Sequence, residues 1–196
     1  MKKEDFIIIK NDKILINWDK VLKLKYFNEL YDIHQNKKWH FEDNVLIHTM
    51  YVTNLSLELF GNDNTKKNKI MLISALFHDI GKVICTEYKN NNYIAPQHEI
   101  FSDRILRELL SDDEDIEIIS FFVRNHMKPL YALKSKYLIN EILNECDNNL
   151  CTIDNLITFK HCDCVGSIMQ EEDGWREKLI MFKQISEEIQ HENNIK

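Results

Sequence analysis

Six side chains of metal-ligating types fall at inward-facing positions on five predicted helices. They are His48, His78, Asp79, His98, His126 and Asp163. A buried imidazole taken singly is usually a hydrogen-bonded core residue, and Asp79 by itself could simply close its helix. Inward polar groups on five helices cannot each find a neutral partner cheaply, because a buried charge without a partner is costly. A shared divalent cation satisfies imidazole and carboxylate together, and this donor set suits iron, manganese, nickel or zinc.

Apolar periodicity predicts the helices that position these side chains. Residues 70–77 are almost entirely apolar, so their helix, which ends at His78, should be central. A capping box at residues 111–114 opens the helix that presents His126. The predicted helices cover about residues 17–32, 41–60, 65–80, 97–110, 111–128, 136–147, 152–163 and 173–190. We expect a loop over residues 82–96 and a short hairpin over Phe6–Ile16.

Composition and charge narrow the class of protein. The 196 residues include only four Gly and two Pro and contain no repeat, which predicts one all-α domain rather than a β-sandwich. Residues 1–17 are expected to form an N-terminal extension, and residues 18–196 the main domain. The net charge of -7 argues against a surface that binds extended nucleic acid, but not against a small phosphorylated ligand.

The apolar stretches and the cysteines suggest the compartment. The longest apolar stretch is far shorter than the ~20 residues that span a bilayer. Residues 1–10 place acidic side chains before a short apolar run, which is not the pattern of a signal peptide. Five Cys without a CxxC pair predict reduced thiols. We therefore expect a cytoplasmic protein with no membrane span.

Five short motifs carry a resemblance to a known family. They are WHFEDNVLIHT (39–49), HDIGK (78–82), HEIFS (98–102), RNHMKP (124–129) and DCVGS (163–167). In this order they resemble the HD-domain superfamily of metal-dependent phosphohydrolases. They are most similar to the HD domain of bacterial CCA-adding enzymes (tRNA nucleotidyltransferases) and poly(A)-polymerase-like proteins, over about residues 30–170. Phe41 departs from the Pro that is usual in the first motif, and no nucleotidyltransferase head is matched, so nucleotide addition is not implied.

The resemblance divides the six ligands between two metal ions. It implies that one ion is held by His48, His78, Asp79 and Asp163, and that Asp79 bridges to a second ion held by His98 and His126. The expected cofactors are one or two divalent ions per chain, from Mn, Fe, Ni, Co, Mg or Zn.

The same resemblance points to residues that act on the substrate. It implies catalytic roles for Asp79 and Lys82, with Lys82 contacting phosphate, although a cation at a helix C-terminus also stabilises the helix by under about 1 kcal/mol. His40, Arg104 and Lys128 are further candidates for substrate contacts. Each has an alternative: His40 is a surface residue at a helix start, Arg104 pairs with a nearby acid, and Lys128 belongs to a solvated loop.

These observations predict a phosphohydrolase that uses a metal-activated water. Its substrates would be phosphomonoesters or phosphodiesters of nucleotides or RNA ends, without extended nucleic-acid binding and without a membrane partner. Two alternatives stay open. A di-iron HD-type oxygenase would use the same ligands, and a non-catalytic nucleotide-binding or interaction module would share the fold.

Overall fold

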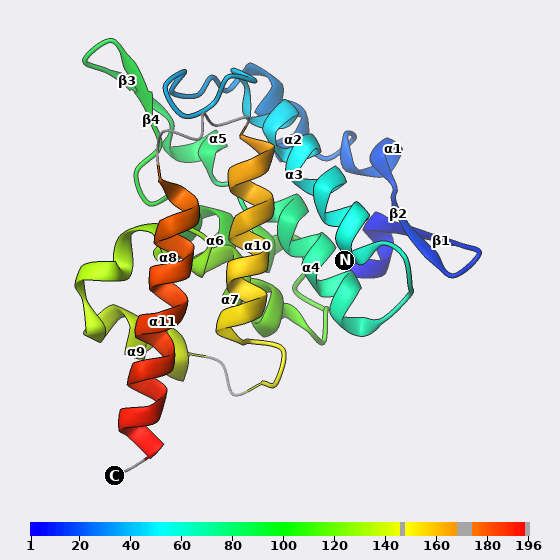
Figure 1. The fold of residues 1–196 in the computed structure, drawn as a ribbon. Helices are drawn as coiled ribbons and strands as arrows, with labels where there is room; N and C mark the ends of the chain where they lie inside the picture. The colour runs from blue at the N-terminus through cyan, green and yellow to red at the C-terminus, as the bar shows by residue number, and fades with distance from the viewer. Residues whose placement is uncertain (146–147, 168–173, 195–196) are drawn as a thin grey trace.

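The computed structural model describes residues 1–145, 148–167 and 174–194, and over these the chain is mostly helical, as the sequence predicts. Figure 1 shows helices packed around α4, two short hairpins that project from the body, and α11 along one side. The elements are η1 (Lys3–Phe6), β1 (Ile7–Lys10), β2 (Lys13–Ile16), α1 (Trp18–Val21), α2 (Lys25–Glu29), η2 (Leu30–Asp32), α3 (Val45–Phe60), α4 (Lys66–Phe77), α5 (Lys82–Cys85), β3 (Glu87–Lys89), β4 (Asn92–Ile94), α6 (His98–Leu109), α7 (Ile116–Asn125), α8 (Lys128–Tyr131), η3 (Ala132–Lys134), α9 (Lys136–Asn144), α10 (Ile153–Gly166) and α11 (Trp175–Asn194).

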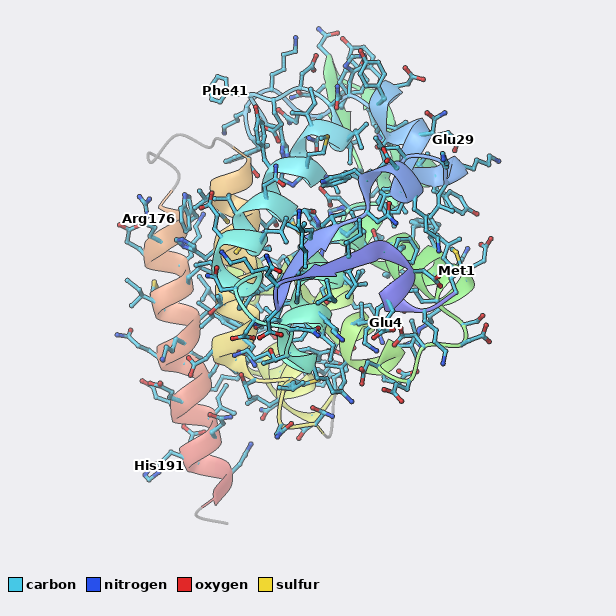
Figure 2. All side chains as sticks on the ribbon, turned by 90° about the vertical axis from the view of Figure 1, so that its right-hand side faces the viewer. Met1, Glu4, Glu29, Phe41, Arg176 and His191 are labelled. Carbon is cyan, nitrogen blue, oxygen red and sulfur yellow. The ribbon has the colours of Figure 1, made fainter. Side chains whose placement is uncertain are left out.

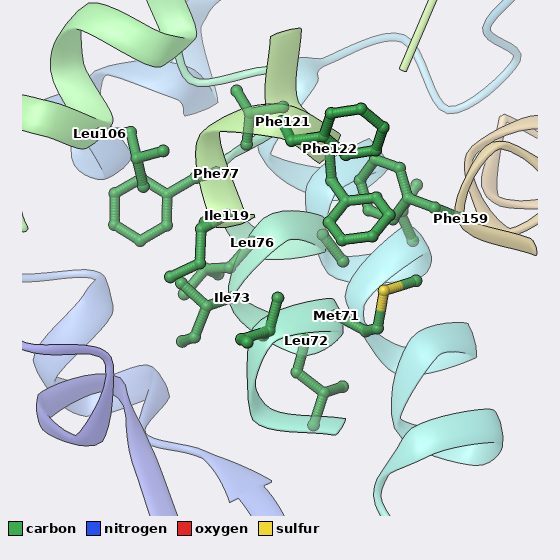
Figure 3. Close-up of a cluster of buried hydrophobic side chains, with 14 of the residues drawn as sticks. Met71, Leu72, Ile73, Leu76, Phe77, Leu106, Ile119, Phe121, Phe122 and Phe159 are labelled. Atoms are coloured by element: carbon green, nitrogen blue, oxygen red, sulfur yellow. The ribbon is translucent and has the colours of Figure 1, made fainter. Parts of the chain in front are cut away.

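Helix α4 forms the centre of the core. Every residue from Ile70 to Phe77 is buried, and a helix that is apolar all round must be covered on all sides. Helices α3 and α7 pack against it, and α10 packs against α3. In Figure 3, side chains of α4 lie among Ile119 of α7 and Phe159 of α10. The end of α4 therefore places His78 and Asp79 inside the protein, where both are buried.

The N-terminal hairpin is present where the sequence predicts it. Strands β1 and β2 pair antiparallel, and the turn residues Asn11 and Asp12 both have positive φ, at 52° and 62°. Two successive residues with positive φ are typical of a type I′ turn, which Asn and Asp tolerate. The Phe6 ring packs edge-on against Phe77 of α4 at a centroid distance of 5.3 Å. The extension thus contributes to the same core as the rest of the chain.

The helix predicted over residues 17–32 is wrong as one helix, because the segment is divided among α1, α2 and η2. Its apolar residues Val21, Leu24, Phe27 and Leu30 are spaced by three. In an α-helix that spacing drifts by about 60° per step, so one straight helix could not turn all four inward. Short helices with breaks between them bury three of these side chains completely and Leu24 partly.

The loop predicted over residues 82–96 is also corrected. It contains α5 and the hairpin β3–β4, whose turn residues Asn90 and Asn91 have φ of 51° and 60°. The pair Asn90-Asn91 was therefore a turn signal of the same type as Asn11-Asp12. The hairpin lies just before α6 in the chain, and its Tyr93 ring contacts His34 at a centroid distance of 5.4 Å.

Two helix starts are later than predicted. Helix α3 begins at Val45 rather than at about residue 41, because the Asn44 side chain accepts a hydrogen bond from the Ile47 backbone N–H and caps the helix. Helix α7 begins at Ile116, after Asp115, and the capping box predicted at residues 111–114 does not form.

Figure 2 shows α11 along one side of the molecule, with Arg176 near its start, and Met1 on the opposite side.

The cysteines follow the prediction only in part. Cys85, Cys162 and Cys164 are free and buried, and burial raises the pKa of each thiol to about 11. Cys151 is disulfide-bonded, so the prediction of a reduced thiol is wrong there. Disulfide pairing depends on which sulfurs the fold brings within bonding distance, and the spacing of cysteines in the sequence does not show this.

Among the described helices, none is long and apolar enough to cross a membrane.

Candidate metal centre

Four buried histidines present the same ring nitrogen to one another. Nδ1 of His78 donates to the Ala75 carbonyl oxygen at 2.8 Å, Nδ1 of His98 to Ala95 at 2.9 Å, and Nδ1 of His126 to Val123 at 2.7 Å. Nδ1 of His48 lies 2.9 Å from the Glu42 carboxylate. Because a carbonyl oxygen only accepts, the ring proton of neutral His78, His98 and His126 is on Nδ1, and the nearby Glu42 carboxylate favours the same tautomer in His48. The Nε2 lone pairs are left free to bind a cation.

The first cluster brings two of these nitrogens to two carboxylates. Nε2 of His48 and Nε2 of His78 lie 3.2 Å apart. Asp163 Oδ1 is 3.1 Å from the first nitrogen and 3.6 Å from the second. Asp79 Oδ2 is 3.4 Å from each of them.

The second cluster uses the other oxygen of the same aspartate. Asp79 Oδ1 lies 3.1 Å from Nε2 of His98 and 3.7 Å from Nε2 of His126, and these two nitrogens are 3.2 Å apart. Asp79 is therefore the residue whose two oxygens face two separate groups of ligands. Each of the six predicted ligands thus lies in one of two groups that could hold a metal ion, His48, His78 and Asp163 in one and Asp79, His98 and His126 in the other.

Unpartnered ligand atoms and their spacing show that the donor set fits divalent cations. Nε2 of His98 and Nε2 of His126 face each other as two acceptors, so no hydrogen bond joins the neutral rings. Asp79 Oδ1 is buried and has no hydrogen-bond partner among the described residues. Ligand atoms held at about 2.1 Å from one ion lie about 3.0–3.4 Å apart in octahedral or tetrahedral geometry. The spacings in both clusters are close to this range, so a cation would satisfy groups that otherwise have no partner.

Without a cation, the electrostatics of the centre favour one proton on His78. Burial opposes its charge, but the neighbouring Asp79 and Asp163 carboxylates raise the pKa of His78 to about 10. The pKa of His126 is well below its usual range, because of burial and of the adjacent His98 and His78 rings. An imidazolium at position 78 thus takes part of the role of a metal ion, and metal binding has to displace its proton.

Each carboxylate of the centre is also paired with a buried lysine. Lys82 Nζ lies 2.6 Å from Asp79 Oδ2 and 2.7 Å from Gln35 Oε1. Lys160 Nζ lies 2.5 Å from Asp163 Oδ2. Burial opposes both negative charges, but Lys82 holds the pKa of Asp79 and Lys160 that of Asp163 well below the usual range. The two aspartates therefore stay ionised and able to bind cations.

Comparison with known protein families matches residues 45–156 to the HD domain. The chain belongs to the HD domain family. The match includes five of the six ligands, and Asp163 follows its end by seven residues. Asp163 is assigned to the centre by its distances to His48 and His78. No curated protein matches the chain, and the narrower resemblance to the HD domains of CCA-adding enzymes is not supported by these comparisons.

A cavity of about 500 Å³ borders the candidate metal centre, and four of the six candidate ligands line it. Asp79, His98, His126 and Asp163 line it, so the ligands can be reached from outside. The predicted contacts His40 and Lys82 also line it, together with Lys160, Lys178 and the aromatic residues Trp39, Tyr93 and Trp175. The cavity therefore combines carboxylates and cations at the metal ligands with aromatic walls.

The loop before α3 connects the first motif to the centre. Glu42 is buried and accepts a hydrogen bond from His40 Nδ1 at 2.8 Å, and the same carboxylate oxygen lies 2.9 Å from His48 Nδ1. Gln35 Nε2 lies 3.4 Å from the same Glu42 oxygen, and Gln35 Oε1 accepts from Lys82. Phe41 is 55% exposed, so the departure from Pro at this position does not reach the metal ligands. Sequence analysis assigned no role to Glu42 or Gln35, although both lie in or beside the first motif.

Two predicted substrate contacts lie away from the cavity. Arg104 is exposed, with its guanidinium 5.4 Å from the centre of the Phe101 ring. It follows His98 by six residues, which corresponds to a rotation of about 240° around the helix, so the two side chains leave α6 on different faces. Lys128 Nζ lies 3.6 Å from Glu145, and neither Arg104 nor Lys128 lines the cavity.

Proposed function

We propose that this HD domain is a metal-dependent phosphohydrolase that cleaves phosphomonoester or phosphodiester bonds of nucleotides or RNA ends. The observation that carries the proposal is Asp79, which lines the cavity and whose two oxygens face two pairs of imidazole Nε2 atoms. Two carboxylate–lysine pairs that line the same cavity favour an anionic substrate over a neutral one. This is the combination of ligands and cations that phosphoryl transfer requires.

Each residue of the site has a separate role in the proposed reaction. His48, His78 and Asp163 would hold one ion, His98 and His126 another, and Asp79 both. When bound, divalent ions polarise a phosphoryl oxygen and lower the pKa of a water, which supplies the nucleophile near neutral pH. Lys82 donates a hydrogen bond to a phosphoryl oxygen while it remains paired with Asp79. The ligands are largely buried, so the fixed charges act in a lower dielectric than that of bulk water.

The cavity and the surface charge favour a small substrate. A volume of about 500 Å³ is within the range of small-molecule pockets. Trp39 and Tyr93 offer aromatic surfaces on which a nucleobase could stack. The net charge of -7 provides no broad cationic surface for the backbone of a long RNA. We therefore propose mononucleotides and short RNA ends, rather than intact RNA, as the preferred substrates.

A phosphoester screen tests the function directly. Purified protein is incubated with 5′-, 3′- and 2′-mononucleotides, 2′,3′-cyclic nucleotides and phosphorylated oligonucleotides, with Mn, Fe, Ni, Co, Mg and Zn added in turn. We expect metal-dependent release of phosphate or opening of the cyclic ester, abolished in Asp79→Asn. Wild-type protein that binds metal and hydrolyses none of these esters would refute the proposal. Product formation that depends on dioxygen would identify an oxygenase instead.

A further inference from the structure

Lys160 is a buried lysine at the metal centre that sequence analysis did not assign to the site. It lies on α10, is 4% exposed, and lines the cavity together with Lys82. A lysine is rarely buried to this extent unless its charge is paired. Its partner is Asp163, one helical turn further along, at 2.5 Å.

The Lys160–Asp163 pair mirrors the Lys82–Asp79 pair. In each, lysine and aspartate are three residues apart, and the lysine binds the Oδ2 oxygen. Asp163 Oδ1 points instead toward His48 and His78, so its two oxygens have different neighbours. The two lysines thus flank the metal ligands through two different carboxylates, and both reach the same cavity.

Lys160 has hydrogen-bonding capacity beyond its carboxylate partner. An ammonium group has three N–H donors. Its contacts among the described residues are Asp163 Oδ2 and the Met127 sulfur at 3.5 Å, and a thioether is a weak acceptor. Lys82 already donates to two oxygens, those of Asp79 and Gln35. Of the two lysines, Lys160 therefore has more donor capacity left for an anion in the cavity.

We propose that Lys160 contacts the phosphoryl group of the substrate, so that Lys82 and Lys160 together bind its oxygens beside the metal centre. This inference rests on the proposed function and adds a second cation to it. A different role is positioning, in which Lys160 only holds Asp163 so that Oδ1 faces the metal. Positioning predicts an effect on metal binding, whereas substrate contact predicts an effect on phosphate binding at unchanged metal content.

Inorganic phosphate is the probe that separates these roles. Its affinity for Mn-loaded wild type, Lys160→Met and Lys160→Gln is measured by titration calorimetry, and the metal content of each protein by elemental analysis. Met fills a similar volume without charge, and Gln keeps a hydrogen-bond donor for Asp163. Lys136→Met is the matched control, because Lys136 is an exposed lysine paired with Glu192. Thermal melts show which variants fold. If Lys160→Met does not fold, Lys160→Gln alone is used for the test.

We expect both Lys160 variants to bind phosphate about 10- to 100-fold more weakly, as the loss of one charge-assisted hydrogen bond implies. Their metal content should equal that of wild type, and Lys136→Met should match wild type in both measurements. Phosphate affinity within twofold of wild type, or a fall in metal content that accounts for the loss, would overturn the inference. An active wild type with unaffected variants overturns only the Lys160 contact. A wild type that neither binds phosphate nor hydrolyses any phosphoester overturns the proposed function as well.

Discussion

Loading the metal-free protein with Mn²⁺ at pH 8 should release about one proton from a single histidine, His78. Burial opposes its charge, but Asp79 and Asp163 raise its pKa to about 10. At pH 8 a group with that pKa is about 99% protonated, whereas an imidazole of ordinary pKa is only about 3% protonated. The His78 ring has to give up the Nε2 proton before that nitrogen can bind a cation. The expected release is therefore many times larger than an ordinary histidine site would give.

The pH dependence follows from the same shift. Proton and metal compete for His78, so apparent metal affinity should rise by about tenfold per pH unit between about pH 7 and pH 9. Stability of the metal-free protein should change in the opposite direction. A raised pKa in the folded state means that the imidazolium stabilises the fold fully below about pH 6.5, and that this contribution is lost as pH rises through about 10.

Calorimetric titrations in two buffers of different ionisation enthalpy count the protons released. His78→Gln and His126→Gln form a matched pair, because each removes one buried imidazole ligand. The pKa of His126 is well below its usual range, so His126 has no proton to lose at pH 8. We expect His78→Gln to lower the release by about one proton per chain and His126→Gln to leave it nearly unchanged. Wild-type release below about 0.2 protons, or an equal loss in both variants, would refute the electrostatic argument.

Three further predictions concern metal, phosphate and substrate size. Asp79→Ala should remove most bound metal, since it deletes the residue facing both clusters, and wild-type metal content by elemental analysis would contradict this. Lys82→Ala should lower kcat/KM by about 10- to 1000-fold, or about 1.4–4 kcal/mol, with metal retained; unchanged kcat/KM would leave Lys82 only its structural pairing with Asp79 and Gln35. A mononucleotide and a tRNA with the same terminal phosphate should differ in kcat/KM by less than about 100-fold, with a log–log salt slope of at most about 2–3. A steep slope and a strong tRNA preference would show that the surface binds RNA.

Helical periodicity predicts that the candidate ligands face inward, whereas their division between two ions comes from the family resemblance. His48 lies on the inward face of α3, and His78 with Asp79 ends the most apolar helix, so burial of those faces brings the polar groups together. Periodicity could not predict which ring nitrogen faces the centre. That depends on backbone carbonyls such as that of Ala75 and on the loop residue Glu42, whose positions follow from tertiary packing.

The misses have physical causes. Lysines usually lie at the surface, so a single lysine in a helix gives no sign that its charge is buried, as it is for Lys160. Arg104 is on the same helix as His98, but their spacing of six residues turns the two side chains to different faces of α6. The hairpin β3–β4 is not predicted from the sequence, because its strands have three residues each, too few for an alternating pattern.

The charges of the centre are consistent with the anionic substrate that we propose for this acidic protein. In the metal-free state the carboxylates of Glu42, Asp79 and Asp163 are balanced by Lys82, Lys160 and the imidazolium of His78, so the buried cluster is formally neutral. Neutrality is what a buried cluster needs, because an uncompensated charge in the interior is costly. Replacing one proton by two divalent ions leaves a formal excess of about three positive charges. A phosphate dianion in the cavity offsets most of that excess. On the proposed function, substrate attraction would therefore depend on metal loading beside the cavity rather than on the surface, where the net charge of -7 acts against it.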